Sequence, residues 1–148
     1  MSYVKIWIHA VWGTKRRQPM MQSECVKDLL IRHIIETSLN KGFQVQVLNG
    51  VSDHLHALIR LKSTQTLDKI MQHVKGESAH WMNQQQLLKD KFKWSHRYYA
   101  ASVSESHRSR VERYIMNQVQ HHKQQTWQQE YEAFMAKHGF VVASDDWD

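Results

Sequence analysis

Apolar and polar residues alternate along four stretches of this chain, at residues 3–12, 43–48, 54–61 and 97–103. Side chains alternate across a strand, so period-two alternation predicts a strand in each stretch. In the first strand, Trp7 and His9 therefore share one face while Ile8 lies on the other. Asn49-Gly50 precedes the third stretch and predicts a tight hairpin turn.

Apolar residues recur at helical spacing between and after these stretches, which predicts helices at residues 20–40, from Thr66 onward, at 106–123 and at 127–138. Gly42 suits the left-handed position that ends the first helix. Residues 106–123 contain no breaker, so we expect one continuous helix there. Thr126 with Gln129 forms a capping box at the start of the last helix.

The predicted order through residue 103 is strand, helix, strand, strand, helix, strand. This order is typical of an α+β fold of ferredoxin-like (RRM-like) type, with a four-stranded antiparallel sheet and two helices on one face. We predict a single domain over residues 1–148, with a core at 1–104 and C-terminal helices at 105–140. The second sheet face is expected to be open and to carry Trp7, His9, His54 and His56.

The charge balance favours a polyanionic partner. Formal net charge is +6 with a pI near 9.5, and the chain holds six tryptophans and five tyrosines. Aromatic side chains stack on unpaired bases, so single-stranded nucleic acid is favoured over a merely solvated basic surface. Lys15, Arg16 and Arg17 follow the first strand and are expected to bind phosphates without reading sequence.

Cysteine content and hydropathy indicate the compartment. Cys25 is the single cysteine, so the chain has no internal disulfide, and this fits a reducing compartment. Its place in an apolar helical stripe predicts a small core residue. No run approaches the roughly 18 apolar residues of a membrane helix. We therefore expect a cytoplasmic protein that does not span a membrane.

His54 and His56 lie two residues apart in a strand, so both imidazoles face the same way. Paired imidazoles on one face form a plausible half of a metal site. Two partly exposed strand histidines are the simpler interpretation of the pair alone. Further candidate ligands elsewhere in the sequence are needed to choose between these two interpretations.

Tyr114 and Gln118 lie four residues apart and so share one face of a helix, with His121 on the same stripe. A tyrosine hydroxyl has a pKa of about 10 and is a poor nucleophile at neutral pH. A divalent cation would polarise a phosphoryl oxygen and so make phenol attack feasible. Two imidazoles and an amide oxygen suit Mg²⁺ or Mn²⁺. A core tyrosine beside a surface amide is the plainer alternative.

These residues together resemble the single-tyrosine HUH transposases of the insertion-sequence type, which include the REP-associated tyrosine transposases. The histidine pair matches the family's motif at His54-Leu55-His56, and the tyrosine motif matches Tyr114, Ile115, Asn117, Gln118, His121 and His122. Further similar stretches are His9–Pro19, Lys75-Gly76 with Ser78, Phe92 with Trp94, Tyr98–Ser104 and Phe134–Phe140. The resemblance covers nearly the whole chain.

The resemblance implies metal-dependent cleavage and rejoining of single-stranded DNA through a 5′-phosphotyrosine intermediate. Tyr114 would be the catalytic nucleophile, and His54, His56 and Gln118 would hold Mg²⁺ or Mn²⁺. Asn117 and His121 would join the basic turn in binding DNA. The partners implied are a second copy of the chain, in a homodimer, and hairpin-forming DNA at element ends.

Two alternatives stay open at this point. A non-catalytic module that binds single-stranded nucleic acid would use the same open sheet face. It would have no need for Tyr114 and Gln118 at helical spacing. Another HUH nuclease, of the replication-initiator or relaxase type, would usually carry its tyrosine in a larger chain.

Overall fold

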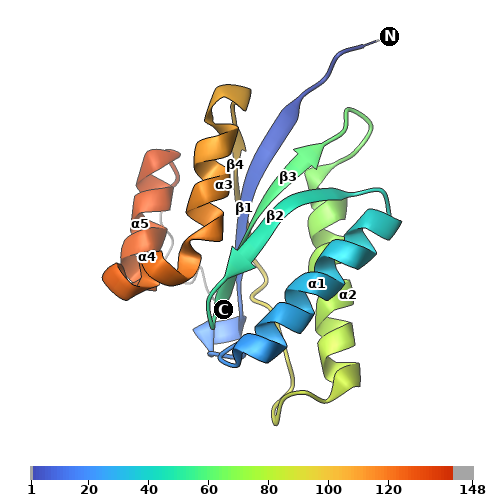
Figure 1. Cartoon of the computed structure of the whole chain (residues 1–148), viewed down its shortest axis with the longest axis vertical. Coiled ribbons are helices and arrows are strands. Elements are labelled where there is room, and N and C mark those ends of the chain that lie inside the picture. The colour runs from blue at the N-terminus through green and yellow to red at the C-terminus, as the bar shows by residue number, and fades with distance from the viewer. Residues whose placement is uncertain (1, 142–148) are drawn as a thin grey trace.

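The computed structural model describes residues 2–141 as a four-stranded sheet between two layers of helices (Figure 1). The strands are β1 (Ile6–Gly13), β2 (Gln44–Gly50), β3 (His54–Leu61) and β4 (Tyr99–Val103). The helices are α1 (Glu24–Asn40), α2 (Leu67–Gln85), α3 (Arg108–Met116), α4 (Gln118–Gln124) and α5 (Trp127–Lys137). The strand order is β2-β3-β1-β4, with every neighbouring pair antiparallel. The predicted ferredoxin-like α+β fold is confirmed.

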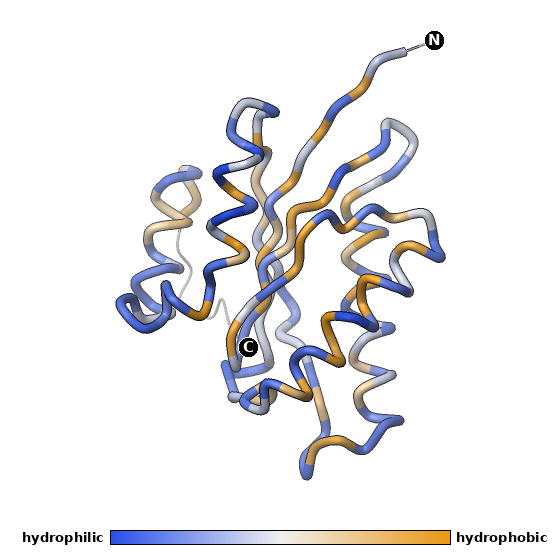
Figure 2. The backbone as a smooth tube through the Cα atoms, in the orientation of Figure 1, coloured by the Kyte–Doolittle hydropathy of each residue, from blue (hydrophilic) through white to orange (hydrophobic). Residues whose placement is uncertain are grey.

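The main core lies between the sheet and the pair α1 and α2. Figure 2 shows apolar residues along the strands, and the buried strand residues on this face include Trp12, Leu55 and Ile59. Leu30 from α1 and Ile70 from α2 are fully buried against them. The predicted caps are confirmed: the Thr66 side chain accepts from the Lys69 backbone, and Gly42 has φ of +77°.

The buried stripe of α1 differs from the predicted one. Cys25 is exposed, so its assignment to the core is wrong. The helix instead buries the stripe that contains Lys27 and Leu30. The Lys27 ammonium donates to the Gly50 carbonyl at 2.9 Å and pairs with Glu24 at 3.2 Å. A buried cation with two such partners fixes the rotation of α1 against the end of β2.

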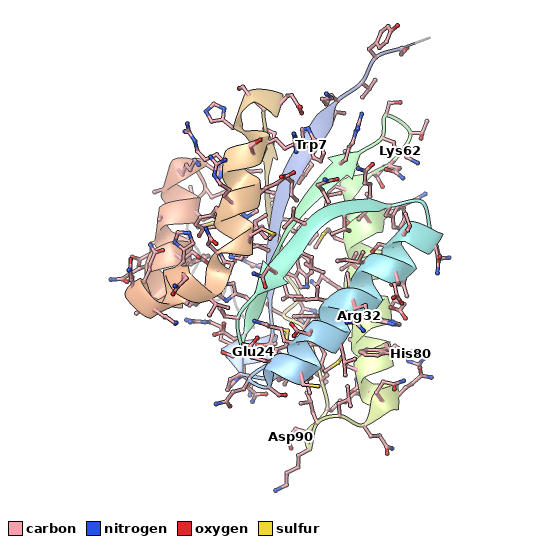
Figure 3. All side chains as sticks on the ribbon, in the orientation of Figure 1. Trp7, Glu24, Arg32, Lys62, His80 and Asp90 are labelled. Carbon is pink, nitrogen blue, oxygen red and sulfur yellow. The ribbon has the colours of Figure 1, made fainter. Side chains whose placement is uncertain are left out.

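The second sheet face is covered, and the prediction that it is open is wrong. Helices α3, α4 and α5 lie on this side of the sheet in Figure 1. Trp7, which Figure 3 labels on β1, packs with Leu58 and Ile115. Trp127 and Tyr131 of α5 pack with Val11 and Tyr99. The apolar stripes of the C-terminal helices thus bury the face that carries the histidines.

The predicted continuous helix over 106–123 is also wrong. The backbone leaves helical values at Asn117, with φ of −97° and ψ of +21°, and the chain turns there from α3 into α4. The side chain of Asn49 donates to the carbonyls of Ile115 and Met116 at 3.1 and 3.0 Å. These bonds satisfy carbonyls that the end of a helix leaves free. Asn49 therefore caps the tyrosine-bearing helix and, with Gly50, lies in β2 instead of the predicted turn.

Smaller differences concern strand ends. β1 begins at Ile6 and β4 at Tyr99, in each case later than predicted. No helix within residues 2–141 combines the length and the apolar character that crossing a membrane requires. The division of the chain at residue 104 and its single-domain organisation stay predictions.

The packing of α3 against the sheet can be tested at Ile115. Its side chain is fully buried against Trp7 and Leu58. We predict that Ile115→Ala lowers the free energy of unfolding by about 2–5 kcal/mol, since the truncation leaves a cavity. Denaturant unfolding measures the loss. Met116→Ala is the control, because its neighbouring side chain is 65% exposed. Equal stability of the two variants would contradict this packing.

Candidate active site

The carboxylate of Glu130, on α5, lies against the histidine pair of β3. Its Oε1 atom is 3.0 Å from His54 Nε2 and 2.8 Å from His56 Nε2. All three side chains are at most 3% exposed. The pair does share one face, as predicted. That face meets an acidic residue of the same chain and not solvent.

Tyr114 and Gln118 meet the other oxygen of this carboxylate. The Tyr114 hydroxyl donates to Glu130 Oε2 at 2.5 Å, and the Gln118 amide nitrogen lies 3.4 Å from the same atom. The His122 ring approaches it as well, with Nε2 at 3.2 Å. Although Tyr114 and Gln118 belong to different helices, the structure brings both to the histidine pair.

A second layer of polar side chains orients the two histidines. His54 Nδ1 lies 2.8 Å from an Asp53 carboxylate oxygen, and His56 Nδ1 lies 2.9 Å from His9 Nε2. Partners on Nδ1 leave the Nε2 atom of each ring for the centre of the site. Metal-binding histidines are oriented by contacts of this kind, which fix the ring and its tautomer.

The two histidines differ in their readiness to take a proton. Burial lowers the pKa of His56 to about 4, although Glu130 opposes the shift. Burial also lowers the pKa of His54, but hydrogen bonds to Asp53 and Glu130 outweigh it and leave that pKa raised. Because a metal binds neutral imidazole, the lowered pKa of His56 favours metal binding, whereas the raised pKa of His54 opposes it.

Burial shifts the pKa values of Glu130 and Tyr114 in the opposite direction to those of the histidines. Burial raises the pKa of Glu130, but the imidazoles of His122, His54 and His56 outweigh burial and hold that pKa far below its usual range. Burial, together with the charge of Glu130, raises the pKa of Tyr114. The site thus combines an ionised carboxylate with a protonated phenol that donates to it.

The donor set fits a divalent cation. Gln118 is fully buried, and its amide oxygen has no hydrogen-bond partner among the described residues. Such an orphaned acceptor is costly unless a donor or cation meets it. Ligand atoms of His54, His122 and Glu130 lie within 4.8 Å of one another. Imidazole nitrogens beside amide and carboxylate oxygens are donors that suit manganese and magnesium.

The other predicted DNA-binding residues lie around this centre. Lys15, Arg16 and Arg17 form a short 3-10 turn after β1. The Arg17 guanidinium pairs with Asp53 at 3.6 Å and lies 5.2 Å from the centre of the Trp127 ring. The His121 ring is 4.6 Å from that of Tyr114, and Asn117 forms the α3–α4 bend. A contact of any of these residues with DNA stays a prediction.

A cavity of about 740 Å³ lies beside Tyr114, between β4, α3 and α5. Its wall includes His9, Tyr114 and Glu130, so it reaches the catalytic candidates. Arg110 and Lys137 also line it, and both are exposed. The remaining lining residues are Ser102, Val103, Ser104, His107, Val111, Gln125, Ala133, Phe134 and His138. The cavity thus joins a cationic rim to the tyrosine.

Sequence reasoning missed Glu130 and left His9, Asp53 and His122 without roles. A signal for Glu130 was present, because it lies one turn after Trp127 and next to Tyr131 in the apolar stripe of α5. A charged residue inside such a stripe is buried only with partners. The partners themselves lie 74 and 76 residues away in sequence, so the pattern cannot name them.

Comparisons with known proteins agree with this fold. The family model described as "Transposase IS200 like" matches residues 2–118. The ISDra2 transposase TnpA of Deinococcus radiodurans is 28% identical over 115 residues, which cover 74% of this chain and 81% of that protein.

Two solved structures share the fold. A chain from Deinococcus radiodurans R1 that is named as a transposase superposes with a TM-score of 0.64 at 27% identity, covering 80% of this chain and 95% of that one. A REP-associated tyrosine transposase bound to a REP hairpin gives a TM-score of 0.58 at 16% identity, covering 95% and 73%. The second likeness concerns the fold alone.

The fold and these relatives, which are named as transposases, define an enzyme class that transfers DNA strands. The chain is a member of the family of IS200-like transposases, because the family model spans most of its length. The resemblance found in the sequence is confirmed. The alternative of a binding module without catalysis is disfavoured by this membership.

Proposed function

We propose that this chain cleaves and rejoins single-stranded DNA, with Tyr114 as nucleophile and a divalent cation held by His54, His56 and Gln118. One observation carries the proposal. The Tyr114 hydroxyl and the histidine pair converge on a single carboxylate, with His56 and Tyr114 ring centres 5.7 Å apart. A nucleophile and a candidate metal-binding cluster at this separation can act on the same phosphodiester.

In the cleavage step, the Tyr114 oxygen attacks the scissile phosphorus and the 3′ oxygen of the preceding nucleotide leaves. The products are a 5′-phosphotyrosine and a free 3′-hydroxyl, so the phosphodiester energy is kept for rejoining. The bound cation, Mg²⁺ or Mn²⁺, supplies charge stabilisation at the phosphoryl oxygens. Glu130 Oε2 accepts the hydrogen bond of the phenol proton before attack. In the step itself the phenol loses this proton, and the departing 3′ oxygen gains one to become the hydroxyl.

The cavity beside Tyr114 is the route by which we propose that a DNA strand reaches the nucleophile. His54 and His56 are each 1% exposed, so a strand cannot reach them across a bare sheet face. Arg110 and Lys137 line the cavity, and their charges complement phosphates. Hairpin-forming element ends stay the proposed substrate, while Lys15, Arg16, Arg17, Asn117 and His121 stay proposed DNA contacts.

Tyr114 and the histidine pair of one chain already meet, so the arrangement supports attack within a single chain. The homodimer that the resemblance implies stays a prediction. In such a homodimer, Tyr114 of one subunit would not have to enter the active site of the other subunit. A cytoplasmic site of action is likewise a proposal, in keeping with a DNA substrate.

The nucleophile is tested by trapping the covalent intermediate. Single-stranded oligonucleotides that cover both flanks of the gene are incubated with the protein and Mn²⁺. We predict a DNA–protein adduct, located on the Tyr114 peptide by mass spectrometry. It should be absent in Tyr114→Phe and in the presence of a chelator. Tyr3→Phe, whose tyrosine is 93% exposed at the N-terminus, should retain it. Adduct formation by Tyr114→Phe would refute the assignment.

The route is tested by DNA binding. We predict that Arg110→Ala and Lys137→Ala each weaken binding of a single strand and lower the salt slope by about 0.7, the value for one lost phosphate contact. Fluorescence anisotropy over a series of salt concentrations measures both. Lys89→Ala is the matched control, because this exposed lysine precedes Asp90, which Figure 3 labels far from α5. Unchanged slopes in both cavity variants would place the strand elsewhere.

A further inference from the structure

We infer that Glu130 is itself a ligand of the metal, so that α5 adds a carboxylate to the proposed ligands from β3 and α4. This inference rests on the proposed metal at His54 and His56. It adds a charged oxygen ligand from the last described helix. It also gives α5 a part in the reaction centre in addition to its part in packing.

The spacing of the ligand atoms is the first support. Neighbouring ligands of an octahedral ion, with bonds of about 2.1 Å, lie about 3 Å apart. Glu130 Oε1 is 3.0 Å from His54 Nε2 and 2.8 Å from His56 Nε2. These separations are those of hydrogen bonds and also of adjacent ligands of one ion, so the carboxylate oxygen can become a ligand beside each imidazole when the side chains open around a cation.

The two oxygens of the carboxylate face different groups. Oε1 faces the two imidazoles, whereas Oε2 accepts from the Tyr114 hydroxyl. A carboxylate that binds the cation through one oxygen can keep the tyrosine on its other oxygen. Ligand and nucleophile would then be held at a fixed separation by one rigid group.

Charge and burial are the second support. Glu130 is 3% exposed and has no Lys or Arg partner among the contacts of the described residues. A divalent cation would add positive charge beside this buried carboxylate, whose contacts are otherwise imidazole, amide and phenol groups. A carboxylate also favours hard ions such as Mg²⁺ and Mn²⁺ over softer ones.

The alternative is that Glu130 is a plug that takes the place of the cation and must leave before the metal binds. The two roles predict opposite effects of removing the charge. Loss of a ligand weakens metal binding, whereas loss of a competitor strengthens it. Metal affinity therefore separates them without any measurement of DNA cleavage.

The test is Mn²⁺ titration of the full chain, followed by calorimetry and by the electron paramagnetic resonance signal of free Mn²⁺. We predict that Glu130→Gln weakens binding by about tenfold or more, as loss of a metal contact does. Glu132→Gln, an exposed glutamate on the same helix, should bind as the wild type does. Equal or tighter binding by Glu130→Gln would overturn the inference.

A second readout uses the unaltered chain and so does not depend on the folding of a variant. Lys123 at the end of α4 and Lys137 at the end of α5 are exposed sites for trypsin. If Glu130 is a ligand, Mn²⁺ ties α5 to β3 and slows cleavage at both lysines. Faster tryptic cleavage in the presence of Mn²⁺ would indicate that the cation displaces Glu130, as the plug alternative requires. A wild type that binds no Mn²⁺ would refute the proposed metal site as well, whereas an unaffected Glu130→Gln would refute this inference alone.

Discussion

The contact between the Glu130 carboxylate and the His54–His56 pair is the interaction on which the rest of this molecule depends. It joins α5 to the centre of the sheet, and the same carboxylate also receives Tyr114 from α3. Strand, tyrosine helix and closing helix therefore share one buried polar junction. Because breaking a buried ionic contact leaves an uncompensated charge, this junction holds the C-terminal helices in register with the histidines.

Apolar packing positions that junction, and the hydrogen bonds that cap α3 hold the tyrosine helix beside it. Ile115 inserts beside Leu58, and the Asn49 side chain of β2 donates to the last carbonyls of the tyrosine helix. An edge strand and a central strand thus determine where Tyr114 lies. An active site that needs a phenol within reach of a cation gains from such a framework, because precise positions come from rigid elements.

Covering the histidine face changes how substrate must approach. A bare sheet would let a strand lie across the aromatic residues, as in many single-strand binders. Here the sheet face is buried, and the cavity between β4, α3 and α5 reaches Tyr114 from the side. In the proposed route, the positive charges of Arg110 and Lys137, which line that cavity, meet the phosphates of the strand. Access and catalysis are consequently linked through the position of α5.

Periodicity predicted the sheet and most helices, because alternation and helical spacing depend on near neighbours. The shared face of His54 and His56 followed from the same rule. The cover over that face could not be predicted this way, since it depends on which distant surface the stripe of α5 meets. The α3–α4 bend at Asn117 escaped prediction for a similar reason, because its cap comes from Asn49 on another strand. Cys25 was predicted in the core but is exposed, because α1 buries Lys27 instead, whose ammonium donates to the Gly50 carbonyl.

The most direct measurement is an anomalous difference map from crystals of the wild-type chain grown with Mn²⁺. A strong peak should lie within about 2.0–2.4 Å of His54 Nε2, His56 Nε2 and a Glu130 oxygen. Tyr114 of the same chain should stand beside it. A manganese peak on the two histidines with Glu130 turned away from it, or with the tyrosine of another chain in that place, would contradict the central role given to this carboxylate.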